Sequence, residues 1–328
     1  MTTVQKRKKP PRLETPKKQY ALTDCALSGI RGIGQLLHVL RWEGSRQELE
    51  DLPAAQGSYK VWRTDQGRAI QAVNLKEANG SKLRQIQARI AVLLRRVLPP
   101  EYRHSGVRGR SFITNAQQHL QDDPSIKLDI KSFYPSTTFQ HVRRFFVEAM
   151  RCSGDVAFLL AKLCCYQQRH LPTGGVHSEV VAFYCHKRSF DQLWERVKAR
   201  SGKMSVYVDD IMLTMPNASL TDLEWARRLF AKQRVKIHPG KSKVLSKRSI
   251  KVITGVEIRG GKTGAPKEQH RLIKQRFDEI RAAASADELA GAVKSLLGHL
   301  DHVAQIDPRF VNRARGTRAR LKAVIDHN

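Results

Sequence analysis

The stretch SVYVDDIML, from Ser205 to Leu213, places two adjacent aspartates, Asp209 and Asp210, inside an apolar run. Apolar residues on both sides predict a β-hairpin with the two acids at its turn. Aspartate is also a common turn residue, so an ordinary polar turn is an alternative interpretation. Other parts of the chain have to distinguish a functional pair from a structural one.

The chain as a whole is strongly basic. Its 328 residues include 59 lysines and arginines against 30 aspartates and glutamates, which gives a formal net charge of +29. Such an excess opposes compactness by self-repulsion and predicts a polyanionic partner, with nucleic acid first and a membrane surface second. No apolar run approaches the about 20 residues that a spanning helix needs. We therefore expect nucleic acid, and no membrane, as the partner.

The N-terminus, MTTVQKRKKPPRLETPKK, is basic and proline-rich and lacks the apolar core of a secretory signal. We expect residues 1–20 to form a disordered basic tail. The five cysteines show no C-x-x-C spacing, which predicts neither a disulfide framework nor a zinc site. Reduced thiols and a cytoplasmic location fit this pattern.

Hydrophobic periodicity predicts helices and strands in alternation. Helices are expected over 21–51, 74–99, 138–150, 155–168, 179–199, 220–233 and most of the chain from about 266. Strands are expected within 57–73, on both sides of an Asp-Gln-Gly turn, and within 125–136, 205–213 and 243–260. This mixture predicts an α+β fold, with an antiparallel sheet covered by helices on one face.

A third carboxylate occurs in a matching context. Asp129 lies near the end of the apolar strand in SIKLDIKSFYPS (125–136). If this strand neighbours the hairpin, Asp129 and Asp209 project side by side, with Asp210 close. Such an all-oxygen cluster suits hard divalent cations such as Mg²⁺, which can activate a hydroxyl and stabilise a leaving pyrophosphate. On so basic a chain, this predicts phosphoryl transfer onto a polynucleotide.

These motifs resemble those of reverse transcriptases, most closely the bacterial retron type. YVDD (207–210) is similar to the palm hairpin of the family, and LDIKSFYPS (128–136) to its first palm motif. Asn115-Ala116-x-x-His119 is similar to the retron N-A-x-x-H motif, and Ile253-Thr254-Gly255 to the retron V-T-G element. The resemblance covers about 55–315 and implies a right-hand polymerase fold with fingers, palm and helical thumb.

The resemblance implies a division of the chain into four parts. These are a basic tail at 1–20, N-terminal helices and fingers at 21–120, a palm with the catalytic carboxylates at 121–258, and a helical thumb or RNA-binding region at 259–328.

It also implies roles for single residues. Asp129, Asp209 and Asp210 would be catalytic and would bind two Mg²⁺ ions, for which Mn²⁺ is a possible substitute. The implied nucleotide-binding residues are Arg68 on the triphosphate, Tyr134 against a ribose 2′-OH, Gly174 under the base pair and Lys241 near the leaving pyrophosphate. The implied RNA-binding residues are Asn115, His119, Arg313, Arg315 and Arg318. Structural alternatives stay open: a core tyrosine at 134, solvated charges at 68 and 241, and capping or stapling of a palm helix by Asn115 and His119.

One loop departs from the family pattern. LPTGGVHSE (171–179) stands where L-P-x-G-x-P-T-S-P is usual, with Val176 and Glu179 in place of both prolines. Nucleotide choice and fidelity therefore stay open. Glu179 also fits a plain first-turn acid of a helix.

The retron resemblance implies an RNA-directed DNA polymerase that binds a structured noncoding RNA and uses dNTPs. It would prime from a 2′-OH and make a branched RNA–DNA hybrid used in anti-phage defence. A separate effector protein is expected, because no segment after the thumb is large enough for an effector domain. Two alternatives remain: another bacterial reverse transcriptase (diversity-generating, abortive-infection or intron-derived), and a non-catalytic RNA-binding protein on the same scaffold.

Overall fold

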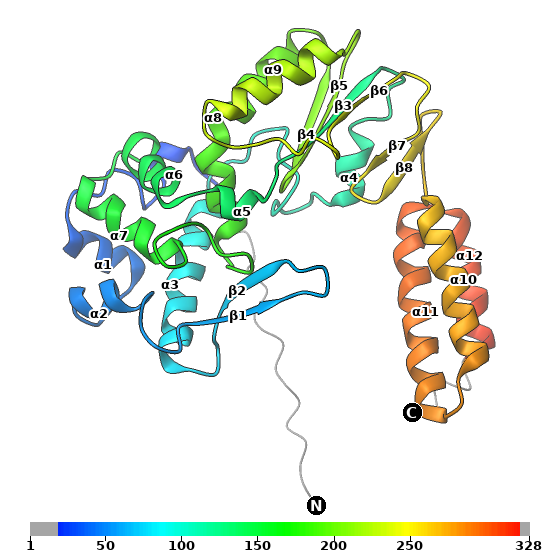
Figure 1. Cartoon of the computed structure of the whole chain (residues 1–328), viewed down its shortest axis with the longest axis horizontal. Helices are drawn as coiled ribbons and strands as arrows, with labels where there is room; N and C mark the ends of the chain where they lie inside the picture. Colours follow the sequence, from blue (N-terminus) through cyan, green and yellow to red (C-terminus); the bar gives the residue numbers. More distant parts are fainter. Residues whose placement is uncertain (1–18, 322–328) are drawn as a thin grey trace, which may run out of the picture.

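A four-stranded antiparallel sheet, in the order β4–β5–β3–β6, lies between the N-terminal helices and the C-terminal helices, in the upper part of Figure 1. This computed structural model describes residues 19–321, so nearly all of the predicted tail at 1–20 lies outside it. The strands are β3 (Ser125–Asp129), β4 (Lys203–Tyr207), β5 (Asp210–Thr214) and β6 (Lys243–Leu245). The predicted hairpin around the two aspartates is thus confirmed as β4–β5.

The two faces of this sheet enter different cores. Ile211 and Leu213 of β5 enter the large core, whereas Met212 between them enters a second, smaller one. Because side chains alternate along a strand, Lys127 and Asp129 of β3 share the face of Met212. The carboxylates therefore project from the less crowded face of the sheet.

The large core is covered by most of the helices. These are α1 (Ile33–Leu40), α2 (Arg46–Asp51), α3 (Ala78–Arg95), α5 (Phe133–Ser136), α6 (Phe139–Arg144), α7 (Gly154–Cys164), α8 (Ser178–Lys198) and α9 (Leu220–Ala231), with a short 3₁₀ turn η1 (Leu22–Asp24) and a π-helix η2 (Phe145–Ala149). The continuous helix predicted over 21–51 is wrong. The left-handed conformation of Arg41 (φ 59°) ends α1, and Ser45 begins α2 with a capping box.

The opposite face of the sheet is also partly covered. Short helix α4 (Phe112–Gln117) and a three-stranded sheet of β7 (Lys251–Ile253), β8 (Val256–Arg259) and β9 (Lys262–Gly264) pack there with Met212 and Leu245. The α+β prediction is confirmed, although cover is not restricted to one face.

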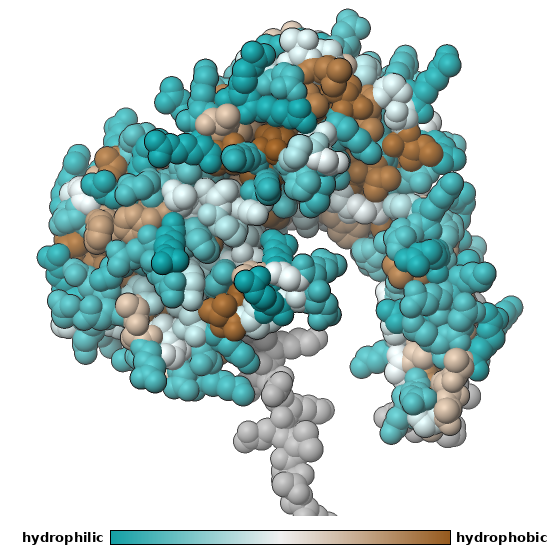
Figure 2. All heavy atoms as spheres, in the orientation of Figure 1, coloured by the Kyte–Doolittle hydropathy of each residue, from teal (hydrophilic) through white to brown (hydrophobic). Residues whose placement is uncertain are grey.

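Two further units flank the centre. The predicted hairpin in 57–73 is confirmed as β1 (Tyr59–Arg63) and β2 (Ala69–Val73). The C-terminal helices α10 (Lys267–Ala282), α11 (Ala286–Ile306) and α12 (Arg309–Arg320) form a bundle with a small core of its own. Figure 2 shows this bundle standing apart from the β1–β2 hairpin across a wide hollow with mainly hydrophilic walls. In residues 19–321 we find no helix with the length and apolarity needed to cross a bilayer.

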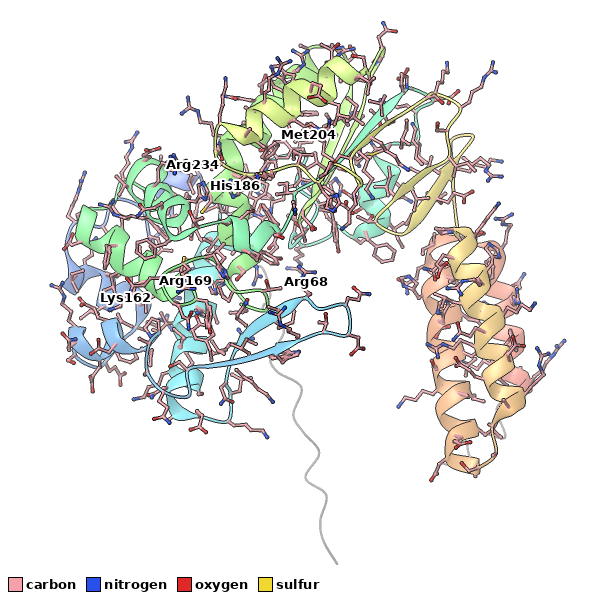
Figure 3. All side chains as sticks on the ribbon, in the orientation of Figure 1. Arg68, Lys162, Arg169, His186, Met204 and Arg234 are labelled. Atoms are coloured by element: carbon pink, nitrogen blue, oxygen red, sulfur yellow. The ribbon has the colours of Figure 1, made fainter. Side chains whose placement is uncertain are left out.

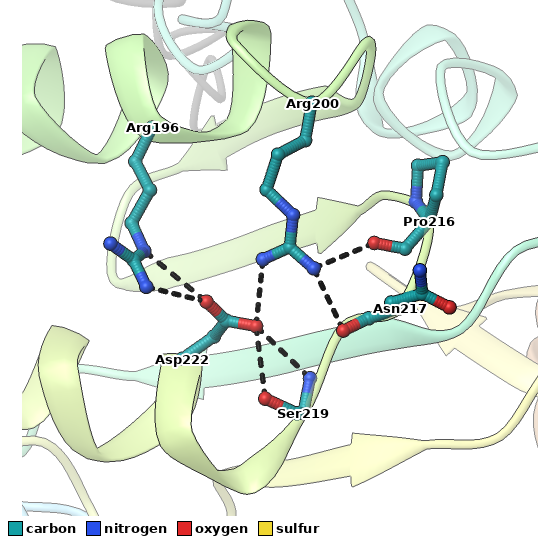
Figure 4. Close-up of polar contacts among 6 residues, drawn as sticks. All are labelled: Arg196, Arg200, Pro216, Asn217, Ser219 and Asp222. Carbon is teal, nitrogen blue, oxygen red and sulfur yellow. Dashed lines mark hydrogen bonds and ion pairs between the residues drawn. The ribbon is translucent and has the colours of Figure 1, made fainter.

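A buried carboxylate fixes α9 against α8 beside the sheet (Figure 4). Asp222 accepts hydrogen bonds from Arg196 and Arg200, 2.9 Å each, and caps its own helix through Ser219. Burial alone would raise the pKa of Asp222, but the two guanidinium groups outweigh burial and lower that pKa. Of this pair of helices, α8 contacts β4 and α9 contacts β6.

Candidate active site

Two of the three predicted acids are direct cross-strand neighbours. Asp129, the last residue of β3, pairs with Asp210, the first residue of β5. We expected Asp209 beside Asp129, but Asp209 lies in the turn, where its carbonyl accepts a hydrogen bond from the Ile130 N–H at 3.0 Å. The sheet thus brings all three acids to one end of β3 and β5.

The turn that carries Asp209 is strained. Val208 has a φ of 59°, in the left-handed region that β-branched residues rarely adopt. Such a conformation costs about 1–3 kcal/mol and persists only where the surrounding structure imposes it. Here the pairing of Tyr207 with Asp210 closes a two-residue loop and imposes it.

The acids repel one another. Burial raises the pKa of Asp209, and the charges of Asp210 and Asp129 raise it further. Burial also raises the pKa of Asp210, where the ammonium of Lys127 acts in the opposite direction and Asp129 adds to the rise. The cluster therefore attracts positive charge.

Two lysines supply part of that charge. Lys127 Nζ lies 3.5 Å from Asp210 Oδ1, and Lys241 Nζ lies 3.5 Å from Asp129 Oδ2. Lys241 was predicted near this site. Lys127 was not, although its position two residues before Asp129 puts both side chains on one face of the strand.

The donor set suits a hard cation in its chemistry. In the described part of the chain, no three His, Cys, Asp or Glu side chains are grouped so as to hold a metal ion. Asp129 and Asp210 nevertheless offer only carboxylate oxygens, and their mutual repulsion is relieved by bound positive charge. The residues present thus fit a divalent cation by type of ligand.

Tyr134 and Arg68 approach the same site from different elements. Tyr134 belongs to α5, and burial followed by the charges of Glu179 and Asp209 raises its pKa, while Arg68 acts to lower it. The Arg68 charge also acts to lower the pKa of Asp209. In Figure 3, Arg68 extends from the β1–β2 hairpin toward the central sheet. The structure therefore brings these two predicted residues together with the acids.

The backbone at position 174 requires a glycine for a structural reason. Its φ is +126°, and a Cβ there would lie 3.1 Å from the Gln71 carbonyl oxygen. Next to it, the Thr173 N–H donates to Gln71 Oε1 at 3.0 Å. The loop 171–179 is therefore fastened to β2, and the close approach is to that strand.

The structure also explains why glutamate stands at position 179, where the resembled family usually has proline. Its carboxylate accepts hydrogen bonds from Arg103 Nη2 at 3.0 Å and from Ser105 Oγ at 2.8 Å. The Arg103 side chain is only 2% exposed and lies over the Phe183 ring. Glu179 is thus the counter-ion of a buried arginine. Sequence reasoning missed this pair, because an arginine in so basic a chain is by default solvated.

Asn115 and His119 serve as internal contacts in this structure. His119 is fully buried, with ring nitrogens 2.9 Å from Thr214 Oγ1 and 2.8 Å from Ser205 Oγ, and burial lowers its pKa to about 3. Asn115 Nδ2 donates to Thr254 Oγ1 at 3.3 Å. These contacts are what the stapling interpretation describes, and they leave no His119 nitrogen free for RNA.

The predicted RNA-binding arginines lie in the C-terminal bundle, outside the acid cluster. Arg313, Arg315 and Arg318 are exposed on α12. Arg313 lies 5.7 Å from the Phe277 and Phe310 ring centres, and Arg318 pairs with Asp301 at 2.5 Å. Arg315 makes no ion pair among the described residues.

Three curated proteins are similar to this chain in sequence. The retron Se72 reverse transcriptase of Salmonella heidelberg (strain 579083-10) is 27% identical over 226 residues, which is 66% of this chain and 59% of that protein. The retron Ec86 reverse transcriptase of Escherichia coli is 24% identical, over 62% of each chain. The retron Mx65 reverse transcriptase of Myxococcus xanthus is 27% identical, over 74% of this chain and 60% of that protein. The chain thus spans about 60% of the length of each relative.

Two solved structures are distantly similar. One is telomerase from Candida albicans in complex with a TWJ fragment of telomeric RNA (TM-score 0.48, 11% identity, 80% of this chain and 56% of that one). The other is a foamy viral protease–reverse transcriptase in complex with double-stranded DNA (TM-score 0.45, 14% identity, 94% of this chain and 46% of that one). No family model matches the chain.

The Y-V-D-D hairpin, the Asp129 strand and the N-A-x-x-H motif thus occur in a chain that is similar to three curated retron reverse transcriptases. By sequence, this chain is similar to retron reverse transcriptases, at 24–27% identity over 62–74% of its length.

Proposed function

We propose that this protein is a retron-type RNA-directed DNA polymerase. The observation that carries the proposal is the cross-strand pair of Asp129 and Asp210 with Asp209 at the adjoining turn. Three acids held on a rigid sheet, at a cost in repulsion and backbone strain, suit a catalytic role. A passive RNA-binding scaffold gains nothing from them.

Each residue of the site has a part in the proposed reaction. A pair of divalent cations, Mg²⁺ or Mn²⁺, held by Asp129, Asp209 and Asp210 would supply Lewis-acid activation of the attacking hydroxyl and of the leaving pyrophosphate. Arg68 would bind the triphosphate of the incoming dNTP, since it lies near enough for its charge to act on the pKa of Asp209 and of Tyr134. Tyr134 would exclude a ribose 2′-OH by its bulk, and Lys241 would hold a proton near the pyrophosphate.

The template is proposed to be a structured noncoding RNA, primed from one of its own 2′-OH groups and partly copied into a branched RNA–DNA hybrid. The retron homologues and the net charge of +29 support this choice. A role in anti-phage defence with a separate effector, a cytoplasmic location and the fingers, palm and thumb boundaries given above belong to the same proposal.

Primer extension tests the activity. Wild-type protein on poly(rA)/oligo(dT) with Mg²⁺ and dTTP should extend the primer, and Asp209→Ala should abolish extension while RNA affinity changes little. A wild-type protein that binds RNA yet never extends would leave only the non-catalytic alternative. Sequencing of co-purified nucleic acid separates the retron type from other reverse transcriptases, because only the retron type predicts a short DNA joined 2′ to RNA.

A further inference from the structure

A second basic site lies outside the acid cluster. Two cavities, of about 750 Å³ and about 800 Å³, adjoin between α6, η2, α8 and the end of α9. They share Arg144, Glu148, Lys232 and Gln233 as lining residues. We call these two adjoining cavities together the α6/α8 groove. None of its lining residues belongs to the acid cluster, and in Figure 3 Arg234 beside α6 lies well away from Arg68.

The groove is rich in positive charge. Six basic side chains line it: Arg143, Arg144, Lys187, Arg188, Lys232 and Arg234. Two acids line it as well: Asp191, which is paired with Lys187 at 2.7 Å and accepts a hydrogen bond from Tyr102 at 2.5 Å, and Glu148, which lines both cavities. Six cations against two acids leave an excess of four positive charges. Four of the six cations are arginines, whose planar fork matches the oxygens of a phosphate. The surplus of cations favours a polyanion.

Neutral polar groups accompany the charges. Gln192 is exposed in one cavity, and Gln140 is exposed in the other, which Thr138 also lines. Amides and hydroxyls both donate and accept hydrogen bonds, as does the ribose 2′-OH that distinguishes RNA from DNA. Of the large apolar side chains described in the lining, Val147 alone is exposed, at 38%. An acidic protein partner would need apolar anchors that this surface lacks.

A buried polar network fixes the base of the groove. Gln233 contacts His186 Nδ1 at 3.0 Å and Ser189 Oγ at 2.7 Å, and its carbonyl oxygen lies 2.8 Å from His141 Nε2. Burial lowers the pKa of His186 to about 4, which keeps the ring neutral. Lys232 and Arg234 flank Gln233, so their backbone is held in place. The wall opposite is the π-helix η2, a form often found at functional sites.

We propose that the α6/α8 groove binds the sugar–phosphate backbone of a double-helical RNA stem, separate from the strand being copied. A-form RNA is recognised mainly through its shape, its phosphates and its 2′-OH groups, which are the groups that this lining matches. This inference depends on the proposed function only in identifying the bound polyanion as RNA. The groove itself is an anion-binding site whether or not the protein polymerises DNA.

Charge reversal inside and outside the groove tests the inference. The probe is a blunt RNA hairpin of about 20 base pairs, with a DNA hairpin of the same sequence beside it. The variant is Arg143→Glu/Arg234→Glu, and the matched control is Lys198→Glu/Lys203→Glu, two exposed lysines outside the groove. Fluorescence anisotropy over a range of salt concentrations gives affinity and salt slope.

The groove variant should bind the RNA hairpin about tenfold more weakly, and its salt slope should fall by about 2. The control should stay within about twofold of wild type, and thermal melting should show both proteins folded. Unchanged affinity in the groove variant, or equal loss in the control, would overturn the site. A DNA hairpin that binds as tightly as RNA would overturn the choice of RNA. Retained primer extension with lost hairpin binding separates this site from the catalytic one.

Photo-crosslinking provides a second readout that does not depend on variants. A 4-thiouridine-substituted RNA hairpin on the wild-type protein should label peptides within 138–148 and 232–234. Labelling restricted to α10–α12 or to β1–β2 would place the stem elsewhere.

Discussion

Asp129 and Asp210 are a direct antiparallel pair across β3 and β5, two like charges facing each other where strand pairing ordinarily avoids them. The pair explains why Lys127 and Lys241 each lie 3.5 Å from one of the two carboxylates. Neutralising either acid therefore removes the repulsion between the two carboxylates, and it also removes a charged group that the proposed reaction needs.

Asp210→Asn should separate activity from stability. Primer extension should fall at least about 100-fold because a charged ligand is lost. The free energy of unfolding should stay equal to that of wild type or rise, because burial and the Asp129 charge already disfavour the ionised form. Extension assays and urea unfolding measure the two quantities.

Asp222→Asn is the matched control for that experiment. It removes a carboxylate that Arg196 and Arg200 hold beside the sheet, so it should cost about 2 kcal/mol of stability. Its extension rate per folded molecule should be unchanged. A stabilised Asp222→Asn protein, or a destabilised Asp210→Asn protein, would contradict the roles assigned to these two acids.

The sequence predicted the main elements of this site because period-2 patterning and turn residues are local. Apolar alternation placed Asp129 and the Asp209-Asp210 turn on strands, and an Asp-Gln-Gly turn placed Arg68 on a hairpin. The register that pairs Asp129 with Asp210 instead of Asp209 depends on where β3 meets β5, which no local pattern determines.

Tyr134→Ala should weaken discrimination against ribonucleotides. The side chain lies close enough to Asp209 for the carboxylate charge to raise its pKa, so it is within reach of a nucleotide bound there. Single-nucleotide incorporation of dTTP and UTP opposite poly(rA) should show the ratio of the two rates falling at least about tenfold. Phe133→Leu, at a buried core position beside it, should leave the ratio unchanged. An unaltered ratio in Tyr134→Ala would support the core interpretation of that residue.

The contact between Asn115 and Thr254 joins the N-A-x-x-H helix to the β7–β8 turn. Thr254 has a φ of 46°, an unusual conformation for a β-branched residue, and its hydroxyl donates to the Phe112 carbonyl at 2.8 Å. A double-mutant cycle of Asn115→Ala and Thr254→Val should give a coupling energy of about 1 kcal/mol in urea unfolding. Additive losses would show that the two motifs act independently.

Five buried histidines should make the fold acid-sensitive, and burial lowers the pKa of each, His141 included. Burial lowers the pKa of His104, His177 and His186 to about 4, and that of His119 to about 3. Below the unfolded pKa of about 6.5, the unfolded chain binds protons that the folded chain cannot. Stability should therefore fall as pH falls from about 6.5 to about 4, by up to about 1.4 kcal/mol per pH unit for each histidine. Urea midpoints that stay constant between about pH 7 and pH 5 would contradict neutral burial.

Local sequence patterns could not predict the contacts between elements that are distant in sequence. The N-A-x-x-H motif left RNA contact and helix stapling equally open, and only the fold places His119 between Thr214 and Ser205. Likewise, Glu179 is a first-turn acid of α8, as the sequence predicted, and the structure in addition makes it the partner of buried Arg103. Such tertiary pairings decide between interpretations that composition and spacing cannot separate.

A single comparison decides whether the clustered acids are catalytic: dTTP incorporation on poly(rA)/oligo(dT) by wild type, Asp129→Asn and Asp122→Asn. Asp122 is a surface acid whose side chain is 66% exposed, so its substitution controls for charge alone. We expect wild type and Asp122→Asn to extend the primer equally and Asp129→Asn to show no extension, with RNA affinity retained in all three. Extension by Asp129→Asn at the wild-type rate would contradict a catalytic role for the cross-strand pair.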